Sequence, residues 1–282
     1  MSEMQNYTYH CHTNFSDGYD ELTAMVRRAK EIGFAEIGIS DHLIVHKNMR
    51  QGPCWPFMEK NRAAYVYNSD FKSILDKYRR HCDDLRRMSR QENFRILVGF
   101  EVDYFPYNGW EEEFRWFISQ LDVDYLHTGN HFFCSEDCEQ IINMTYFSQV
   151  CTDEALHKEY FSHHFKVLEQ AVNSRLFKFL AHMDYMRRYT DGTEYGEGLF
   201  WEEKEAVLQA LQKTNTALEV STKGLRRTGD FYPDSVIMRR AGRLGIAAVI
   251  SDDAHSTTEL GEDFDKAEEA IKKAGITKRL KF

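Results

Sequence analysis

The chain of 282 residues has no apolar run near the roughly 18 residues that cross a bilayer, and no signal-peptide pattern at its N-terminus. These absences predict a soluble, cytoplasmic protein. An excess of positive charge is also missing, because 36 basic and 45 acidic residues give a formal net charge of −9. A negative surface argues against nucleic-acid binding and does not oppose metal cations. A small metabolite is therefore the more suitable partner.

Paired C-x-x-C spacing is absent from the six cysteines, although Cys134 and Cys138 form a C-x3-C pair in a loop-like stretch. In a chain of this length, six free thiols in a reducing compartment are the simplest expectation. Internal repeats, low-complexity segments and dividing linkers are missing too. We therefore expect one catalytic domain over residues 1–282, a length that strand–helix barrels commonly occupy with one core.

Histidines stand out near the start of the chain, where His10 and His12 lie in a short β-rich run and Asp17 follows. Side chains alternate faces along a strand, so the two imidazoles point the same way while Cys11 points into the opposite layer. Two neighbouring imidazoles suit a metal ion. An isolated H-x-H could also be two exposed histidines at a strand end.

The rest of the chain alternates short β-rich runs with amphipathic helical segments. Strands are expected at residues 7–13, 36–40, 95–100, 125–129, 177–181, 216–220 and 246–251. Helices are expected at 21–32, from a cap at Ser69, at 111–121, 153–174 and 201–213, from a first turn at Pro233 to Gly245, and at 264–274. Residues 43–68 show no clear period and are interpreted as a long loop, either a lid or a substrate wall.

Six of these seven expected strands lead into His, Asp or Glu, and the sixth leads into a basic loop at 221–227. In parallel α/β barrels and open sheets the C-terminal strand ends share one face, where sites are built. The candidate metal ligands on that face are His10, His12, Asp17, His42, Glu101, His131, His182, Asp253 and His255. One zinc ion takes about four ligands, so this set predicts two or three ions. Asp252 is an alternative to Asp253.

Other histidines and carboxylates are given different roles. Asp41 is interpreted as a partner of a ligand or as a structural turn residue. His127 is left out of the ligand set because an extended backbone would point it away from His131. Three mid-helix histidines without ligand spacing are interpreted as surface or packing residues: His157, His163 and His164.

The candidate ligands lie in motifs that resemble those of the polymerase and histidinol phosphatase (PHP) superfamily. These motifs are His10-x-His12 with Asp17, Ser40-Asp41-His42, Gly99-Phe100-Glu101, His131, His182 and Ser251-Asp252-Asp253-Ala254-His255. Residues 182–189 and 219–226 most resemble the monofunctional histidinol-phosphate phosphatase branch. The resemblance implies a distorted seven-stranded (β/α) barrel with its metal site at the C-terminal ends of the strands.

The resemblance also implies a trinuclear site. One ion would be held by His10, His12, Glu101 and Asp253; a second by Glu101 as a bridge with His131 and His182; and a third by Asp17, His42 and His255. These donors are compatible with divalent zinc, manganese or iron. The last family motif usually has one acidic residue after serine, whereas two consecutive aspartates stand here.

The activity implied by the resemblance is hydrolysis of L-histidinol phosphate to L-histidinol and phosphate, in histidine biosynthesis, by a metal-activated water. Arg187 or Arg226 could clamp the phosphoryl group, and His255 or Asp17 could relay a proton to the leaving group. Weaker candidates for the clamp are Arg188, Arg227 and Lys223.

Two alternatives stay open: a PHP phosphoesterase for another small phosphate or a nucleotide, and a non-enzymatic metal-binding or sensor domain. A serine or cysteine nucleophile with a paired histidine has no supporting motif. Aromatic or acidic side chains in 43–68 and 132–151 are candidates for reading a cationic substrate. The oligomeric state is open.

Overall fold

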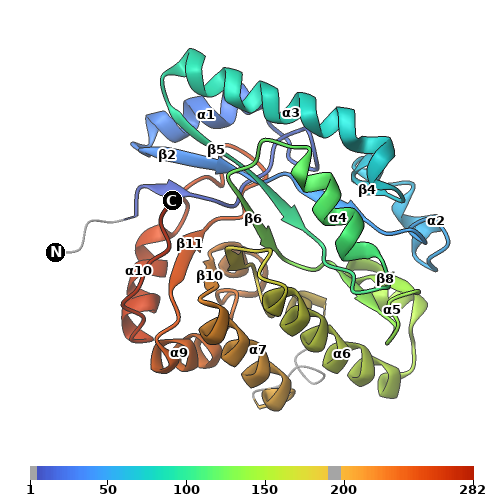
Figure 1. Cartoon of the computed structure of the whole chain (residues 1–282). Helices are drawn as coiled ribbons and strands as arrows, with labels where there is room; N and C mark the ends of the chain where they lie inside the picture. Colours follow the sequence, from blue (N-terminus) through green and yellow to red (C-terminus); the bar gives the residue numbers. More distant parts are fainter. Residues whose placement is uncertain (1–4, 190–197) are drawn as a thin grey trace.

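The computed structural model describes residues 5–189 and 198–282. The expectation about a signal peptide concerns the N-terminus, and residues 1–4 of that segment lie outside the described residues. A mostly parallel sheet, nearly closed into a seven-stranded barrel, forms its centre (Figure 1). Its strands follow the order β1 (Tyr7–Thr8), β2 (Glu36–Ile39), β5 (Arg95–Val102), β6 (Tyr125–Thr128), β9 (Phe179–Leu180), β10 (Ala217–Ser221) and β11 (Ala248–Ser251).

The two ends of this strand order approach each other beyond β1 and β11. Cys11 forms a parallel bridge with Ala254, and the His12 amide donates to the Ala254 carbonyl at 2.8 Å. All neighbouring strand pairs along the order are parallel. The expected fold class, a distorted seven-stranded (β/α) barrel, is therefore confirmed.

Amphipathic helices surround the sheet, as Figure 1 shows. They are α1 (Leu22–Glu31), α3 (Phe71–Glu92), α4 (Trp110–Ser119), α6 (Glu154–Asn173), α7 (Trp201–Thr214), α9 (Ser235–Leu244) and α10 (Phe264–Lys273). In α1 the buried face consists of Met25, Val26 and Ala29, at the spacing that places side chains on one side of a helix. Burial of such faces, more than helix propensity, holds these segments in place.

Two helix starts differ from the sequence expectation. The carboxylate of Asp70, one residue after Ser69, accepts a hydrogen bond from the Ser73 amide and caps α3. Pro233 precedes α9 instead of occupying its first turn, because the Asp234 side chain is the cap and accepts from two amides of that turn. The end of α9 at Gly245 is as expected, since this residue has a φ of 68°.

Residues 43–68 are more ordered than the expected loop. They contribute to β3 (His42–Val45) and form α2 (Trp55–Met58), the 3₁₀ helix η1 (Ala64–Val66) and β4 (Tyr67–Asn68). Strand β3 pairs with the end of β5, so that His42 lies opposite Glu101. The apolar run Leu43, Ile44 and Val45 is buried there, and this tertiary packing outweighs the weak local pattern.

Residues 132–151 form a hairpin of β7 (Phe132–Cys134) and β8 (Ile141–Asn143), followed by η2 (Met144–Tyr146) and α5 (Phe147–Val150). The hairpin turn brings the Cα atoms of Cys134 and Cys138 to 4.9 Å, and the two cysteines form a disulfide. The expectation of six free thiols is therefore wrong for this pair. The other four cysteines, Cys11, Cys54, Cys82 and Cys151, are free and buried.

Two further short helices stand beside the strand ends. They are η3 (Tyr185–Tyr189), which follows β9, and α8 (Lys223–Thr228), which replaces the basic loop expected after β10. No helix in the described parts of the chain is both long and apolar enough to cross a membrane.

The N-terminal half of the barrel is filled by large side chains. A buried cluster joins Tyr7, Tyr9, Leu97, Tyr125, Phe179, Ala181, Ala217 and Val249, and the C-terminal Leu280 and Phe282 pack against it. Gly99 permits this filling, because a Cβ atom there would lie 2.2 Å from the Tyr125 ring. Polar ligands are thereby left for the other end of the barrel.

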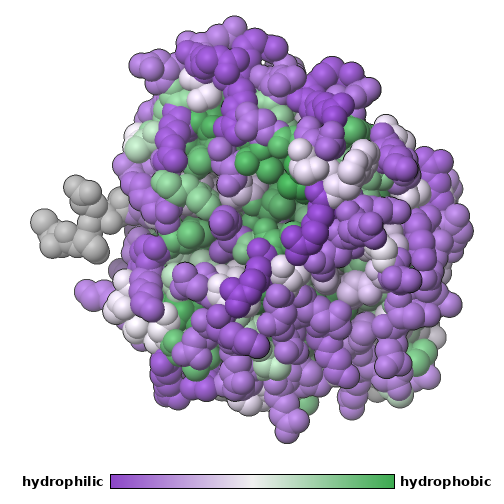
Figure 2. Space-filling model, viewed as in Figure 1, coloured by the Kyte–Doolittle hydropathy of each residue, from purple (hydrophilic) through white to green (hydrophobic). Residues whose placement is uncertain are grey.

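On the molecular face seen in Figure 1, hydrophilic residues predominate, with hydrophobic residues gathered near its upper middle, over β5 (Figure 2).

Candidate metal centre and active site

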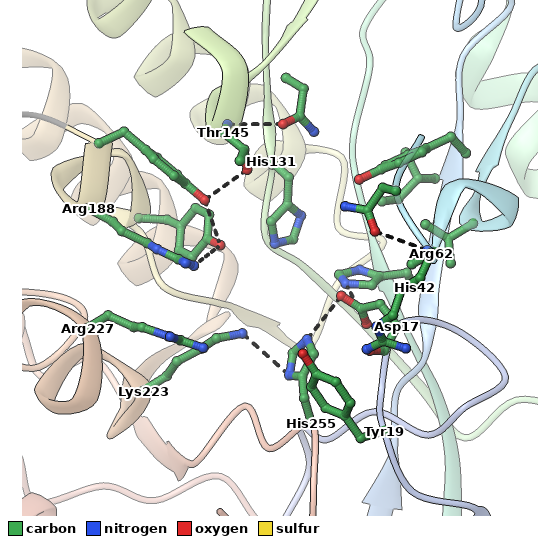
Figure 3. Close-up of a pocket in the computed structure, with 18 of the residues that line it drawn as sticks. Asp17, Tyr19, His42, Arg62, His131, Thr145, Arg188, Lys223, Arg227 and His255 are labelled. Carbon is green, nitrogen blue, oxygen red and sulfur yellow. Dashed lines mark hydrogen bonds and ion pairs between the residues drawn. The ribbon is translucent and has the colours of Figure 1, made fainter. Parts of the chain in front are cut away.

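The nine residues expected as ligands converge at the C-terminal ends of the strands. They come from the segments after β1, β9 and β11, from β3 and β5, and from the turn between β6 and β7. Four of them line the pocket in Figure 3, namely Asp17, His42, His131 and His255. The other five are buried: His10, His12, Glu101, His182 and Asp253.

The first group of close donor atoms surrounds the two histidines of the H-x-H. His10 Nε2 lies 3.3 Å from Glu101 Oε2 and 3.6 Å from Asp253 Oδ1. His12 Nε2 lies 3.4 Å and 3.3 Å from the same two oxygens. These four side chains therefore face one point, with two imidazole nitrogens and two carboxylate oxygens around it.

A second group uses the other oxygen of the same glutamate. His182 Nε2 lies 2.7 Å and His131 Nε2 3.8 Å from Glu101 Oε1. Because Oε2 faces the first group and Oε1 this one, the Glu101 carboxylate can bridge two ions.

A third group lies on the pocket side of the H-x-H. Asp17 Oδ1 is 3.4 Å from His42 Nε2, and Asp17 Oδ2 is 3.1 Å from His255 Nε2. His42 Nδ1 also lies 3.1 Å from Glu101 Oε2, so the third group adjoins the first.

The donor atoms of these groups fit metal ions. Several are buried and lack a hydrogen-bond partner: His10 Nε2, both nitrogens of His12, Asp17 Oδ1, His42 Nδ1, Glu101 Oε2 and Asp253 Oδ1. Leaving a buried polar atom unpaired costs about 1–3 kcal/mol, and several such atoms aimed at one another need a common partner. Divalent cations satisfy both the lone pairs and the negative charge.

Electrostatic effects within the cluster are mutual. Burial opposes ionisation of Glu101, but the imidazoles of His10, His131 and His42 hold its pKa well below the usual range. Burial also disfavours a charged His10, yet Asp253, Glu101 and Glu219 together raise its pKa well above normal. For His12, burial and the positive charges of His255 and His42 lower the pKa to about 3, so this imidazole is neutral and able to ligate.

Two buried carboxylates that the sequence does not single out orient the candidate ligands. Glu219 Oε1 lies 2.6 Å from His10 Nδ1, and its Oε2 accepts from the His182 amide at 2.8 Å. Asp103 lies 2.9 Å from His131 Nδ1 and accepts from the amide of the same residue at 2.7 Å. A carboxylate on the far nitrogen fixes the ring and raises its basicity as a ligand. The sequence signal for Asp103 was its position two residues after Glu101, directly beyond the end of β5.

Asp41 is a structural residue of the turn below the site. Its carboxylate accepts from the Thr13 amide and hydroxyl, both at 2.8 Å, and from the Ser16 hydroxyl at 2.5 Å. It also lies 2.9 Å from Nε2 of His81, a residue of α3 that the sequence reasoning did not single out. Asp41 thereby connects the segment that carries His12 to the rest of the barrel.

His127, which the sequence analysis excludes from the ligand set, points into the barrel interior and belongs to none of the groups of close donor atoms found among the described residues. Its ring centroid is 4.2 Å from that of His10 and 4.4 Å from that of Phe179, on which it stacks. Burial and the nearby His10 hold its pKa well below normal. His127 packs beneath the first group of ligands as a neutral ring.

Asp252, the alternative to Asp253, faces away from the groups described above. It lies 3.2 Å from the Thr8 hydroxyl and accepts from the Gly261 amide at 2.6 Å. Asp253, by contrast, lies 2.9 Å from the Lys223 ammonium as well as near the two histidines of the H-x-H.

The two arginines expected to clamp phosphate are engaged elsewhere. Arg187 pairs with Asp184 and Asp230 and donates to the Phe231 carbonyl. Arg226 donates to the Asp252 carbonyl at 2.6 Å and pairs with Glu262 at 3.4 Å. Among the described residues that line the pocket, the cationic ones near η3 and α8 are Arg188, Lys223 and Arg227.

The pocket above the ligands has a volume of about 300 Å³. Figure 3 shows Arg188, Lys223 and Arg227 on one side, Asp17, His42 and Arg62 on the other, and His131 and His255 between them. Lys223 Nζ lies 3.5 Å from His255 Nδ1, so the cationic side reaches the ligand groups. Tyr67, Asn143, Thr145 and Tyr189 also line the pocket. A small anionic molecule with a polar tail matches its size and charge.

Fold and site together define a parallel barrel whose strand ends carry a group of potential metal ligands. The family model of the PHP domain matches residues 8–223, and the chain belongs to this family. It therefore has a PHP phosphoesterase fold. A comparison with curated proteins finds no match.

Solved structures with the same fold include two from bacteria. A candidate histidinol phosphatase from Listeria monocytogenes has a TM-score of 0.73 at 20% identity, covering 92% of this chain and 99% of its own. Histidinol phosphate phosphatase from Lactococcus lactis subsp. lactis Il1403, complexed with zinc, L-histidinol and phosphate, has a TM-score of 0.69 at 21% identity. That match covers 99% of this chain and 97% of the Lactococcus chain.

Proposed function

We propose that this protein is a metal-dependent phosphomonoesterase that hydrolyses L-histidinol phosphate to L-histidinol and phosphate in the cytoplasm. The observation that carries the proposal is the convergence of nine nitrogen and oxygen ligands beneath a pocket with cations along one side. The similar Lactococcus protein, which binds zinc, L-histidinol and phosphate, supports the choice of substrate. We also propose that residues 1–282 form one catalytic domain.

Two or three divalent ions, zinc, manganese or iron, complete the proposed site. One is assigned to His10, His12, Glu101 and Asp253, one to Glu101, His131 and His182, and one to Asp17, His42 and His255. Once bound, such ions supply a nucleophilic water at neutral pH and positive charge for the phosphoryl oxygens. The chain itself contributes the rigid placement of these ligands, which Glu219 and Asp103 maintain by hydrogen bonds to His10 and His131.

We propose that Lys223 and Arg188 hold the phosphoryl group, with Arg227 at the pocket rim. Lys223 lies 2.9 Å from Asp253 and 3.5 Å from His255, which places its ammonium beside the ligand groups. Arg188 reaches the pocket beside Tyr185, whose hydroxyl accepts from it at 3.2 Å. Arg187 and Arg226 were the sequence-based candidates, and their ion pairs suit them to hold η3 and α8 in position.

The proton for the leaving alkoxide is assigned to the pair of His255 and Asp17. Both side chains line the pocket, so either can reach the substrate oxygen when two ions are bound and the third position is empty; with three ions bound, Nε2 of His255 and the Asp17 carboxylate, which are 3.1 Å apart, would hold the third ion instead. The imidazole and amine of the substrate are assigned to the tyrosine-rich wall, where Tyr67, Tyr185 and Tyr189 line the pocket.

Initial rates with L-histidinol phosphate and with monoesters that lack its imidazole or its amine test the substrate assignment. We expect the highest kcat/KM for L-histidinol phosphate. Equal rates across the panel would move the assignment to another small phosphate or a nucleotide, and no release by metal-loaded protein would favour a non-enzymatic metal-binding role. Lys223→Gln should raise KM at least about tenfold because it removes a charged hydrogen bond to phosphate. The matched control is Lys266→Gln, because Lys266 lies on α10 and its ammonium pairs with Asp263, the residue before this helix.

A further inference from the structure

The β7–β8 hairpin and helix α6 place two sulfur atoms and an imidazole together, apart from the ligands at the strand ends. Cys134 ends β7, Cys138 follows in the hairpin turn, and His163 lies in α6. One donor atom from each of the three lies within 4.8 Å of the other two. None of the three residues belongs to the nine ligands described above.

The imidazole is available to a ligand. His163 Nε2 is buried and has no hydrogen-bond partner, while Cys134 and Cys138 are 4% and 0% exposed. A buried nitrogen without a hydrogen-bond partner lowers the stability of the fold. A cation bound by this nitrogen and by both sulfurs would remove that free-energy cost.

The surroundings provide both access and charge balance. Cys134 and His163 line a cavity that also includes Glu136 and Lys166, so an ion can reach the sulfurs from solvent. Two thiolates and a neutral imidazole bound to a divalent ion have no net charge. The positive charge of Lys166 therefore does not oppose the occupied site.

We propose that the reduced Cys134–Cys138 pair and His163 form an additional binding site for a thiophilic divalent cation, such as zinc. Both thiols lose their protons when the cation binds, two sulfurs and one nitrogen ligate it, and a water or the Glu136 carboxylate takes the fourth position. The disulfide and the cation use the same sulfur atoms, so the disulfide-bonded chain cannot hold the ion here.

The site has a structural role. Strand β7 begins directly after His131, and the Cys138 carbonyl lies 2.7 Å from Nε2 of His46, which follows β3. An ion that joins the hairpin turn to α6 would therefore fix the backbone beside His131. It stabilises the fold without contacting the substrate pocket.

Cobalt binding to the protein reduced with a phosphine tests this site. Cobalt bound by thiolate gives a charge-transfer band in the near ultraviolet, which imidazole and carboxylate ligands alone do not give. We expect this band in the reduced wild-type chain, and we expect about one equivalent of cobalt per chain less in Cys134→Ser and Cys138→Ser. His163→Gln should raise the cobalt concentration at half-saturation at least about tenfold, since an outer partner of a ligand already costs that much.

Cys82→Ser is the matched control, because Cys82 is also buried but lies in α3. It should keep the band, and circular dichroism reports whether each variant is folded. Absence of the band in the reduced wild-type chain would overturn the proposal. A band that survives in both Cys134→Ser and Cys138→Ser, or that Cys82→Ser abolishes, would overturn it as well.

Discussion

Replacing Glu219 by Gln tests whether this carboxylate orients the proposed metal ligands. The substitution leaves all of those ligands in place. The Glu219 carboxylate is fully buried and carries three contacts: His10 Nδ1 at 2.6 Å, the Ser251 hydroxyl at 2.6 Å and the His182 amide at 2.8 Å. Glutamine has nearly the same shape but only one acceptor oxygen. Whichever way its amide turns, an NH₂ group then faces one of these donors.

The expected losses of stability and of metal affinity follow from these contacts. A buried donor left without an acceptor costs about 1–3 kcal/mol, so the free energy of unfolding should fall by about this amount. His10 also loses the negative partner that fixes its ring, and such losses weaken metal binding or activity by about 10 to 100-fold. KM should change little, because Glu219 does not line the pocket.

The assay is phosphate release from L-histidinol phosphate as a function of added metal. Glu219→Gln should need about 10 to 100 times more metal for half-maximal rate, and excess metal should restore part of kcat. Glu139→Gln is the control, because Glu139 forms an exposed ion pair with Lys47. An unchanged metal requirement, or a change in KM alone, would refute the positioning role of Glu219.

Three further predictions concern the site and its surroundings. Gly129→Ala should lower kcat/KM at least about 100-fold, because the new Cβ atom would lie 2.3 Å from the His182 ring and displace it; near-normal kinetics in the folded variant would be inconsistent with the described site. Burial lowers the pKa of His164 to about 3, so its contribution to stability is complete above pH 6.5, and by pH 5 about 2 kcal/mol of it is lost. Other buried histidines, including His12, titrate in both proteins, so on lowering the pH to 5 urea unfolding of the chelated wild type should lose about 2 kcal/mol more than His164→Gln, and equal losses would contradict the assignment. Chelation should lower the thermal midpoint of unfolding, and added metal should restore it. A free metal concentration of about 100 times the dissociation constant adds about 2.7 kcal/mol to the free energy of unfolding for each bound ion. An unchanged midpoint would argue against bound ions.

The sequence was sufficient for the barrel because its strands are short apolar runs followed by chemically distinctive residues. His10, Glu101 and His182 each stand at a strand end, and the parallel arrangement brings such ends together. The convergence of these residues could therefore be predicted from the strand assignments alone, without the details of side-chain packing.

Features that depend on contacts between residues far apart in the sequence could not be predicted. Glu219 and Asp103 are orienting residues only because β10 and β5 bring them to His10 and His131. The Cys134–Cys138 contact depends on the hairpin turn, which has no strong glycine signal. Nothing in the spacing of the arginines indicated that Arg187 would turn to Asp230 while Arg188 faces the pocket.

Phosphate release during a metal titration of the chelated protein, with L-histidinol phosphate as substrate, tests the central claim most directly. The proposal predicts no release without metal and a rate that rises until two or three ions are bound per chain. Release at full rate without metal, or saturation with metal without release, would contradict it.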